Sequence, residues 1–368
     1  MIKSQQMTIQ FICNAHNARR LDPKKRNHVL AQLQGEGHKR VESFLFEQIF
    51  ARTAVQSLGQ TNVSSGWSFQ CDEKNIPHYW FKLNSPANQW NTCDDQVTGF
   101  LSNTGCIIFS INYDYEEHKF YATQFSDGIW QPQQLLTDVF KQLTGKKSQV
   151  RNIRNILPEA QKKAIDKINA SFSDAELYQL SLSRLLTNCY LVPWFDRQPM
   201  DIDVCCMVNN QIHFLEFKRK YPTRSGTFGI DKYPHVSFAG WLENAGKTLS
   251  LIILVDPLWN KDESPLHLLD EVSVTASDAV WIGVPLHASA LSGKTFSTSG
   301  QDSGMNPGNR YQPEIRMESF RILGQSMDIA PESLSTFLTN PASLPPVTTH
   351  TLTSIRDAAR DKYYRQKR

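Results

Sequence analysis

The sequence lacks the features that mark membrane, secreted and zinc-binding proteins. Its seven cysteines are an odd number, and they form neither a Cys-x-x-Cys pair nor a spacing with histidine that is typical of zinc sites. No run approaches the ~18 consecutive apolar residues of a membrane-spanning helix, and the N-terminus lacks the apolar run and cleavage site of a signal peptide. We therefore expect a cytoplasmic protein in a reducing compartment, with no membrane as partner.

The sequence also lacks a strong charge of either sign. Its net charge of +3 does not by itself indicate a nucleic-acid partner, so any basic surface must be local. The 368 residues, 40% hydrophobic and 20% charged, are typical of a globular protein and suffice for two or three domains. No internal repeat is evident.

The most informative stretch is 200–220, which predicts two strands joined by a tight turn. Asn209 and Asn210 separate two alternating runs, and asparagine tolerates the positive φ that a two-residue hairpin turn requires. If these two residues form the loop, Val208 faces Gln211 across the hairpin. The same register can then be followed to the other end of both strands.

At that end the register places Asp203 opposite Glu216 and Asp201 opposite Lys218, all four on one face of the sheet. Three carboxylates so close together require a cation, and Mg²⁺ or Mn²⁺ suits carboxylate oxygens on a rigid scaffold. Lys218 could orient an attacking water or neutralise the charge that grows on a phosphorus centre. The alternative is a solvated hairpin end with a cross-strand Asp–Lys pair.

The remaining pattern around the hairpin predicts an α/β fold with a mixed sheet flanked by helices. A helix from Asp174 to about Cys189 precedes it, and a helix over 235–244 and the apolar strand 249–255 follow it. If Tyr190-Leu191-Val192 is a first strand, the order is αβββαβ. Another strand is expected over 280–284.

Asp203, followed thirteen residues later by Glu216-Phe217-Lys218, resembles the motif of the PD-(D/E)XK nuclease superfamily, which includes many restriction endonucleases and Holliday-junction resolvases. The similarity covers about 170–260 and implies the same αβββαβ core. It also implies a Mg²⁺-dependent endonuclease acting on DNA, in which Asp203, Glu216 and Lys218 are catalytic. Asp203, Glu216 and the Phe217 carbonyl would then hold the metal.

Two further acids remain open as metal ligands. The acidic strand begins Pro199-Met200-Asp201-Ile202-Asp203 rather than Pro-Asp, so Asp201 is kept as a second or alternative ligand. Glu176 completes a Ser-x-x-Glu capping box with Ser173. The family, however, often has a glutamate on the helix before the sheet, and the resemblance therefore also implies Glu176 as a ligand.

We predict three regions along the chain. Residues 1–150 form an α+β domain that binds DNA or a partner, residues 151–290 form the nuclease-like domain, and residues 291–368 form a flexible loop and a basic extension. The expected N-terminal elements are helices over 38–58 and 133–143 and strands over 66–69, 79–81, 106–111 and 120–125. Residues 287–313 are expected to be a loop or linker, followed by a short strand (315–323), a short helix (331–338) and a basic helix from Thr353 that is a frayed tail or a DNA contact.

Basic residues on both sides of the core are candidates for contacts with the phosphate backbone, although like-charged runs are often only solvated. Asp231, Tyr233 and His235 close the loop after the hairpin and are expected to border the cleft. The candidate DNA-binding residues are Lys146, Lys147, Arg151, Arg154, Arg219, Lys220, Arg224 and Lys232.

The sequence thus favours a metal-dependent DNA endonuclease of a restriction, defence or transposition type. Two alternatives remain: a nucleic-acid-binding module that does not cleave, and an assembly subunit of a larger DNA-processing complex. A double-strand cutter would need two active sites, and hence a homodimer or a partner subunit.

Overall fold

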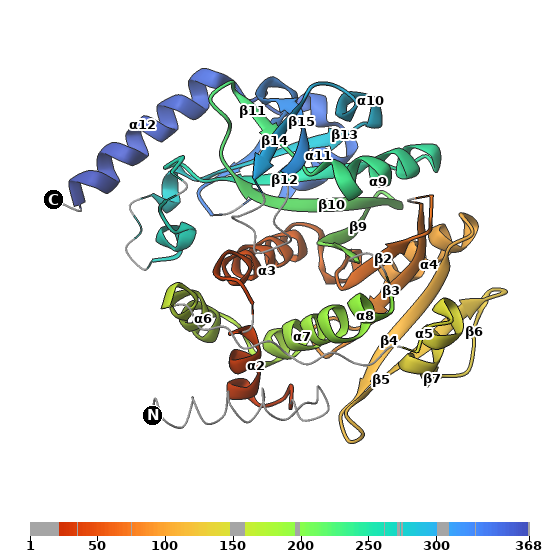
Figure 1. Cartoon of the computed structure of the whole chain (residues 1–368). Coiled ribbons are helices and arrows are strands. Elements are labelled where there is room, and N and C mark those ends of the chain that lie inside the picture. The colour runs from red at the N-terminus through yellow and green to blue at the C-terminus, as the bar shows by residue number, and fades with distance from the viewer. Residues whose placement is uncertain are drawn as a thin grey trace. The chain divides into compact units, whose positions relative to one another are not determined.

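The computed structural model describes two compact units. Unit 1 comprises Met1–Val41 and Ser64–Ile202, and unit 2 comprises Glu42–Val63 and Asp203–Arg368 (Figure 1). The chain therefore enters unit 2, returns to unit 1 and enters unit 2 again. The residues described are 22–34, 36–74, 76–147, 159–195, 199–260, 262–270, 273, 275–299, 309–327 and 329–366.

The α/β fold class is confirmed, because both units contain a mixed sheet and helices. The division into units differs from the predicted boundaries near 150 and 290, which fall inside unit 1 and unit 2 respectively. The reason is packing between residues far apart in sequence. Phe50, predicted to belong to the N-terminal domain, stacks on Phe217 with ring centroids 5.1 Å apart.

Unit 1 is built on a sheet with the strand order β6-β5-β4-β3-β2-β8, and β7 pairs with β5. β3 and β4 run parallel, and α4 connects them; the other neighbours pair antiparallel. All the strands and helices predicted between 66 and 143 are present. The elements are α2 (Arg26–Leu33), β2 (Trp67–Cys71), β3 (Pro77–Leu83), α4 (Thr92–Asn103), β4 (Ile107–Asp114), β5 (Lys119–Ser126), β6 (Ile129–Trp130), β7 (Gln134–Leu135), α5 (Leu136–Thr144), α6 (Glu159–Ser171), α7 (Asp174–Leu185), α8 (Val192–Trp194) and β8 (Met200–Ile202).

The first strand of the predicted αβββαβ order is wrong. Tyr190 and Leu191 end a π-helical segment, Leu186–Leu191, that continues α7 into α8. Both side chains are buried, and the Tyr190 ring lies 5.0 Å from that of Phe120 on β5. A short apolar run fits a buried helix as well as a strand, and here packing against the sheet of unit 1 decides for the helix.

Unit 2 contains a sheet with the order β1-β9-β10-β12-β13-β16. β10 pairs antiparallel with β9 and parallel with β12, and α9 makes the crossover between the parallel strands (Figure 1). The elements are α3 (His38–Leu58), β1 (Val63–Ser64), β9 (Val204–Val208), β10 (Gln211–Lys220), β11 (Thr227–Gly229), α9 (Lys232–Asn244), β12 (Leu249–Val255), β13 (Val280–Leu286), α10 (Ala288–Leu291), β14 (Thr295–Ser299), β15 (Asn309–Arg316), β16 (Arg321–Gln325), α11 (Pro331–Thr339) and α12 (Thr349–Gln366).

The predicted hairpin is confirmed, and its register is confirmed from the turn as far as Val204. Val208 pairs with Gln211, and the ladder continues to Leu215 opposite Val204. Asn209 and Asn210 have φ values of 51° and 58°, the left-handed conformation that this two-residue turn requires. The local sequence therefore determines which side chains share each face of β9 and β10.

The C-terminal part of the chain is more structured than predicted. Residues 287–313 contain α10 and strands β14 and β15, which form a separate sheet with β11 in the order β11-β15-β14. α12 packs against the segment after β12 through its basic residues: Arg360 donates to the Leu258 carbonyl at 2.7 Å, and Arg356 lies over the Trp259 ring. Across the described residues, no helix has the length and apolar character needed to cross a bilayer.

We predict that Phe50→Ala lowers the free energy of unfolding by about 3–5 kcal/mol, because it opens a cavity beneath β10. Phe50 is fully buried between Phe217 and Trp281. Urea denaturation measures the change, and Tyr311→Ala, at an aromatic side chain that is 58% exposed, serves as the control. Equal stability of the two variants would contradict this packing.

Candidate active site

The candidate site is centred on the carboxylate of Glu216 on β10. Glu216 is only 4% exposed, and its Oε1 forms an ion pair with the ammonium of Lys218, two residues further along the same face. The Nε2 atom of His235 lies 3.0 Å from the same oxygen. Two side chains that can carry positive charge therefore converge on one buried carboxylate oxygen.

His235 is held in place from both sides of its ring. It lies on α9, and its Nδ1 is 3.0 Å from the carbonyl oxygen of Asp231. These two contacts fix the plane of the His235 ring between α9 and β10. The sequence placed His235 at the border of the cleft but gave no signal that it would contact Glu216.

Asp203 lies next to the Glu216-Phe217-Lys218 segment, one residue beyond the end of the antiparallel ladder at Val204. It immediately precedes β9, and its Oδ2 accepts a hydrogen bond from the backbone N–H of Phe217 at 2.6 Å. The charge of Asp203 is also among those that act on Lys218. The structure therefore brings together the three residues proposed as catalytic.

The charges in this cluster stabilise one another against the cost of burial. Burial raises the pKa of Glu216, but Lys218 and His235 outweigh this effect and hold the pKa below its ordinary value. Burial lowers the pKa of Lys218, but Glu216, then Asp203 and more weakly Glu47, outweigh it and raise the pKa. Lys218 therefore remains a cation at neutral pH and is unsuited to act as a base.

The prediction that Asp201 faces Lys218 across the hairpin is wrong. The chain bends at Asp203, so the antiparallel ladder ends at Val204, and β8 belongs to a different sheet. Asp201 pairs with Ser68 on β2, in unit 1. Two-residue alternation holds only along a continuous strand, and the bend interrupts it.

Glu176 forms the capping box that the sequence allows. Its carboxylate accepts from the Ser173 backbone N–H at 2.7 Å, and the Ser173 side chain accepts from the Glu176 N–H. In unit 2 a helix does contribute an acid near Lys218, but this helix is α3 and the acid is Glu47. No local pattern in the sequence indicates Glu47, because α3 lies about 170 residues before Lys218 and reaches it only through tertiary packing.

The carboxylates of Glu216 and Asp203, which both act on Lys218, are the oxygen ligands that a hard divalent cation would use here. The Oε2 atom of Glu216 is buried and has no hydrogen-bond partner, so one carboxylate oxygen is left for a further positive group. Within the described parts of the chain, no three His, Cys, Asp or Glu side chains form a metal-holding group. Mg²⁺ commonly binds one or two carboxylates and completes its shell with water and phosphate oxygens, which Glu216 and Asp203 suit.

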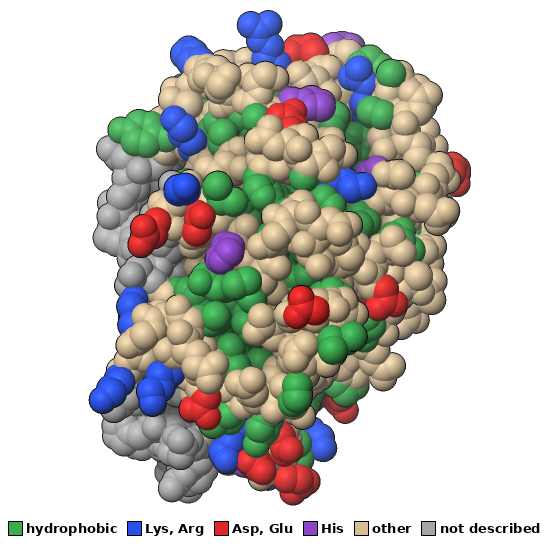
Figure 2. All heavy atoms as spheres, turned by 90° about the vertical axis from the view of Figure 1, so that its right-hand side faces the viewer, with side chains coloured by type: hydrophobic (Ala, Val, Ile, Leu, Met, Phe, Trp, Pro, Cys, Tyr) green, Lys and Arg blue, Asp and Glu red, His purple; other side chains and the backbone are tan. Residues whose placement is uncertain are grey.

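The predicted DNA-binding residues fall into two groups in unit 2. Arg219 and Lys220 have internal partners: Arg219 forms an ion pair with the buried Asp256 at 3.3 Å, and Lys220 donates to the Gly229 carbonyl. Arg224 and Lys232 are exposed. The face in Figure 2 carries basic side chains interspersed with acidic ones.

The remaining basic candidates precede α7 in the chain. Lys147 is exposed and Lys146 partly buried, both just after the end of α5 in unit 1. Arg151 and Arg154 lie outside the described residues.

Comparison with protein-family models finds no matching family. Searches of the curated proteins and of the solved structures likewise find no match. The function is therefore argued from the geometry of the site.

We predict that the Glu216 carboxylate makes stability depend on pH in the acid range. The pKa of Glu216 in the folded state lies below the ordinary 4.5, so in the acid range the unfolded chain binds more protons than the folded one. The contribution of Glu216 to stability is therefore complete above pH 4.5 and is lost as the pH falls below it. Glu216→Gln removes this dependence. Urea denaturation between pH 7 and pH 3 should show a smaller acid loss in Glu216→Gln than in the parent chain or in Glu332→Gln, at an exposed position. Equal losses in all three would contradict the assignment.

Proposed function

We propose that the protein is a metal-dependent DNA endonuclease that hydrolyses phosphodiester bonds at Glu216. The observation that carries this proposal is the buried Glu216 carboxylate, which has Lys218 and His235 on one oxygen and no partner on the other. A buried carboxylate oxygen with no protein partner could accept a divalent cation.

The topology around Glu216 supports the same reading. β9 and β10 form a hairpin, and α9 returns the chain to β12, parallel to β10. This ββαβ order corresponds to the last four elements of the αβββαβ core that the resemblance to PD-(D/E)XK nucleases implies. Asp203 and Glu216-Phe217-Lys218 stand at the matching places in it.

Glu216 and Asp203, with the Phe217 carbonyl, would hold Mg²⁺ or Mn²⁺. When bound, such an ion lowers the pKa of a coordinated water and shields the phosphate charge. Lys218 stays protonated beside Glu216, so its role is to stabilise the negative charge that grows on the phosphate. His235 fixes the orientation of the Glu216 carboxylate from the opposite element, α9.

We predict that the parent chain nicks supercoiled plasmid in Mg²⁺ or Mn²⁺ and does not do so in chelator. Lys218→Met should slow cleavage by about 10²–10³-fold, the typical effect of removing one electrostatic contributor. Glu216→Gln and Asp203→Asn should abolish cleavage, because each removes the negative charge that holds the ion. Agarose gels of time courses on plasmid, linear, branched and single-stranded DNA measure the rates.

Lys294→Met and Glu332→Gln are the matched controls, since both side chains are exposed. Circular dichroism confirms that each variant is folded. DNA binding by the parent without cleavage in either metal would favour a non-cleaving binding module. Cleavage by Lys218→Met at the parent's rate would contradict the role of Lys218.

A further inference from the structure

Unit 1 contains a cavity of about 710 Å³ that the proposed nuclease chemistry does not use. Its volume is typical of sites for small molecules. Five aromatic side chains line it: Trp90, Tyr113, Tyr115, Trp130 and Tyr178. Trp90 and Trp130 meet edge to face, with ring centroids 5.1 Å apart, and Trp130 is 37% exposed. A wall of this kind suits a flat ring.

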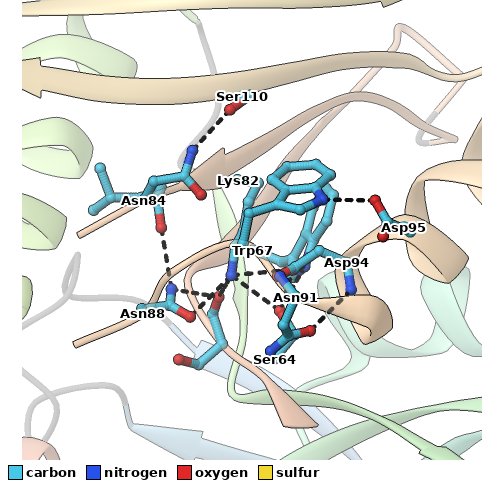
Figure 3. A network of polar contacts seen from close by, with 12 residues as sticks. Ser64, Trp67, Lys82, Asn84, Asn88, Asn91, Asp94, Asp95 and Ser110 are labelled. Carbon is cyan, nitrogen blue, oxygen red and sulfur yellow. Dashed lines mark hydrogen bonds and ion pairs between the residues drawn. The ribbon is translucent and has the colours of Figure 1, made fainter. Parts of the chain in front are cut away.

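The loop that forms one side of the cavity is held rigidly by a buried ion pair. Lys82 and Asp94 are fully buried, with Lys82 Nζ 3.1 Å from Asp94 Oδ1. Lys82 also donates to Asn88 Oδ1 at 2.9 Å, and Asn88 donates in turn to the Leu83 carbonyl at 3.1 Å (Figure 3). These contacts fix the segment 84–90, which supplies several lining residues, before any ligand arrives.

Two polar atoms of this loop are buried without a hydrogen-bond partner. They are Asn84 Oδ1 and Ser85 Oγ, from adjacent residues that both line the cavity. The amide nitrogen of Asn84 donates a hydrogen bond to Ser110 Oγ at 2.7 Å (Figure 3). This bond fixes the orientation of the amide, whose oxygen has no hydrogen-bond partner. Unpartnered buried polar atoms are costly, and a ligand with N–H groups could satisfy them.

Lys24 places a positive charge at the cavity, while the carboxylates of Asp22 and Asp95 bond to the lining residues Tyr115 and Trp90 and are not themselves part of the lining. Lys24 is exposed, and its ammonium lies 3.7 Å from the centre of the Tyr115 ring. Among the described residues that line the cavity, none is an aspartate or glutamate. A ligand with a flat ring at the aromatic wall and a phosphate near Lys24 would satisfy both features.

We propose that this cavity binds a nucleotide, with its base stacked on the aromatic wall around Trp130, its polar edge toward Asn84 and Ser85, and its phosphate near Lys24. The nucleotide is either free or an unpaired unit of a nucleic-acid strand. Bases stack on aromatic side chains whatever their identity, and each of the four carries an N–H that the Asn84 acceptor could take. The inference goes beyond the proposed hydrolysis at Glu216 and does not depend on it.

Isothermal titration calorimetry tests the proposal on the full-length chain in chelator, with Glu216→Gln to prevent turnover. The probes are the four deoxynucleoside 5′-monophosphates, a single-stranded 12-mer of mixed sequence, ribose 5-phosphate and glucose. We expect binding of a monophosphate or of the 12-mer and none of ribose 5-phosphate, which has no base. Binding of the 12-mer alone identifies the ligand as part of a strand.

The variants show whether binding occurs at this cavity. Trp130→Ala should weaken it by about tenfold or more, as expected for loss of one stacking partner, and Trp130→Phe should retain most of it. Lys24→Met should weaken binding and reduce its dependence on salt. Lys74→Met, at an exposed lysine of the same unit, should bind as the parent does.

Three outcomes would overturn the proposal: no binding of any monophosphate or of the 12-mer, binding of glucose in their place, or nucleotide binding that Trp130→Ala leaves unchanged. Because these titrations contain no divalent metal and use Glu216→Gln, failure of the nuclease assignment would not alter them. Failure of nucleotide binding would likewise leave the assignment of Glu216 standing.

Discussion

A buried negative charge, the carboxylate of Glu216, is the constraint on which the candidate site depends. Removing a carboxylate from water carries an effective cost of several kcal/mol unless partners compensate it. Lys218 on the same strand and His235 on α9 supply that compensation. The hairpin and the crossover helix hold these groups together, and Phe50 supports them by packing beneath β10.

The arrangement also explains how the roles within the site can be divided. The carboxylates keep Lys218 protonated, so it serves as a fixed positive charge rather than as a base. One oxygen of Glu216 contacts its protein partners, and the other oxygen has no hydrogen-bond partner. Asp203, bonded to the Phe217 N–H, stands beside the same segment as a second acid. Charge compensation and the proposed binding of a divalent cation thus depend on the same few residues.

Local sequence was enough to predict the hairpin, because Asn209 and Asn210 determine the turn and strict alternation determines the register. It was also enough to place Asp203 beside Glu216-Phe217-Lys218. Local sequence did not predict the position of Asp201. The chain bends at Asp203, and β8 pairs with β2, a strand far away in the sequence. Local sequence also failed for Tyr190 and Leu191, whose apolar run fits helix and strand alike. His235 and Glu47 reach the site only through tertiary packing, which no local pattern encodes.

The most direct test of the central claim is a titration of the protein with Mn²⁺, in which electron paramagnetic resonance measures the free ion. If the partnerless oxygen of Glu216 serves a divalent cation, the parent chain should bind one ion that Mg²⁺ displaces. Glu216→Gln, which keeps the shape of the side chain and removes its charge, should lose that binding. Equal binding by the parent and by Glu216→Gln, or none by either, would contradict the account.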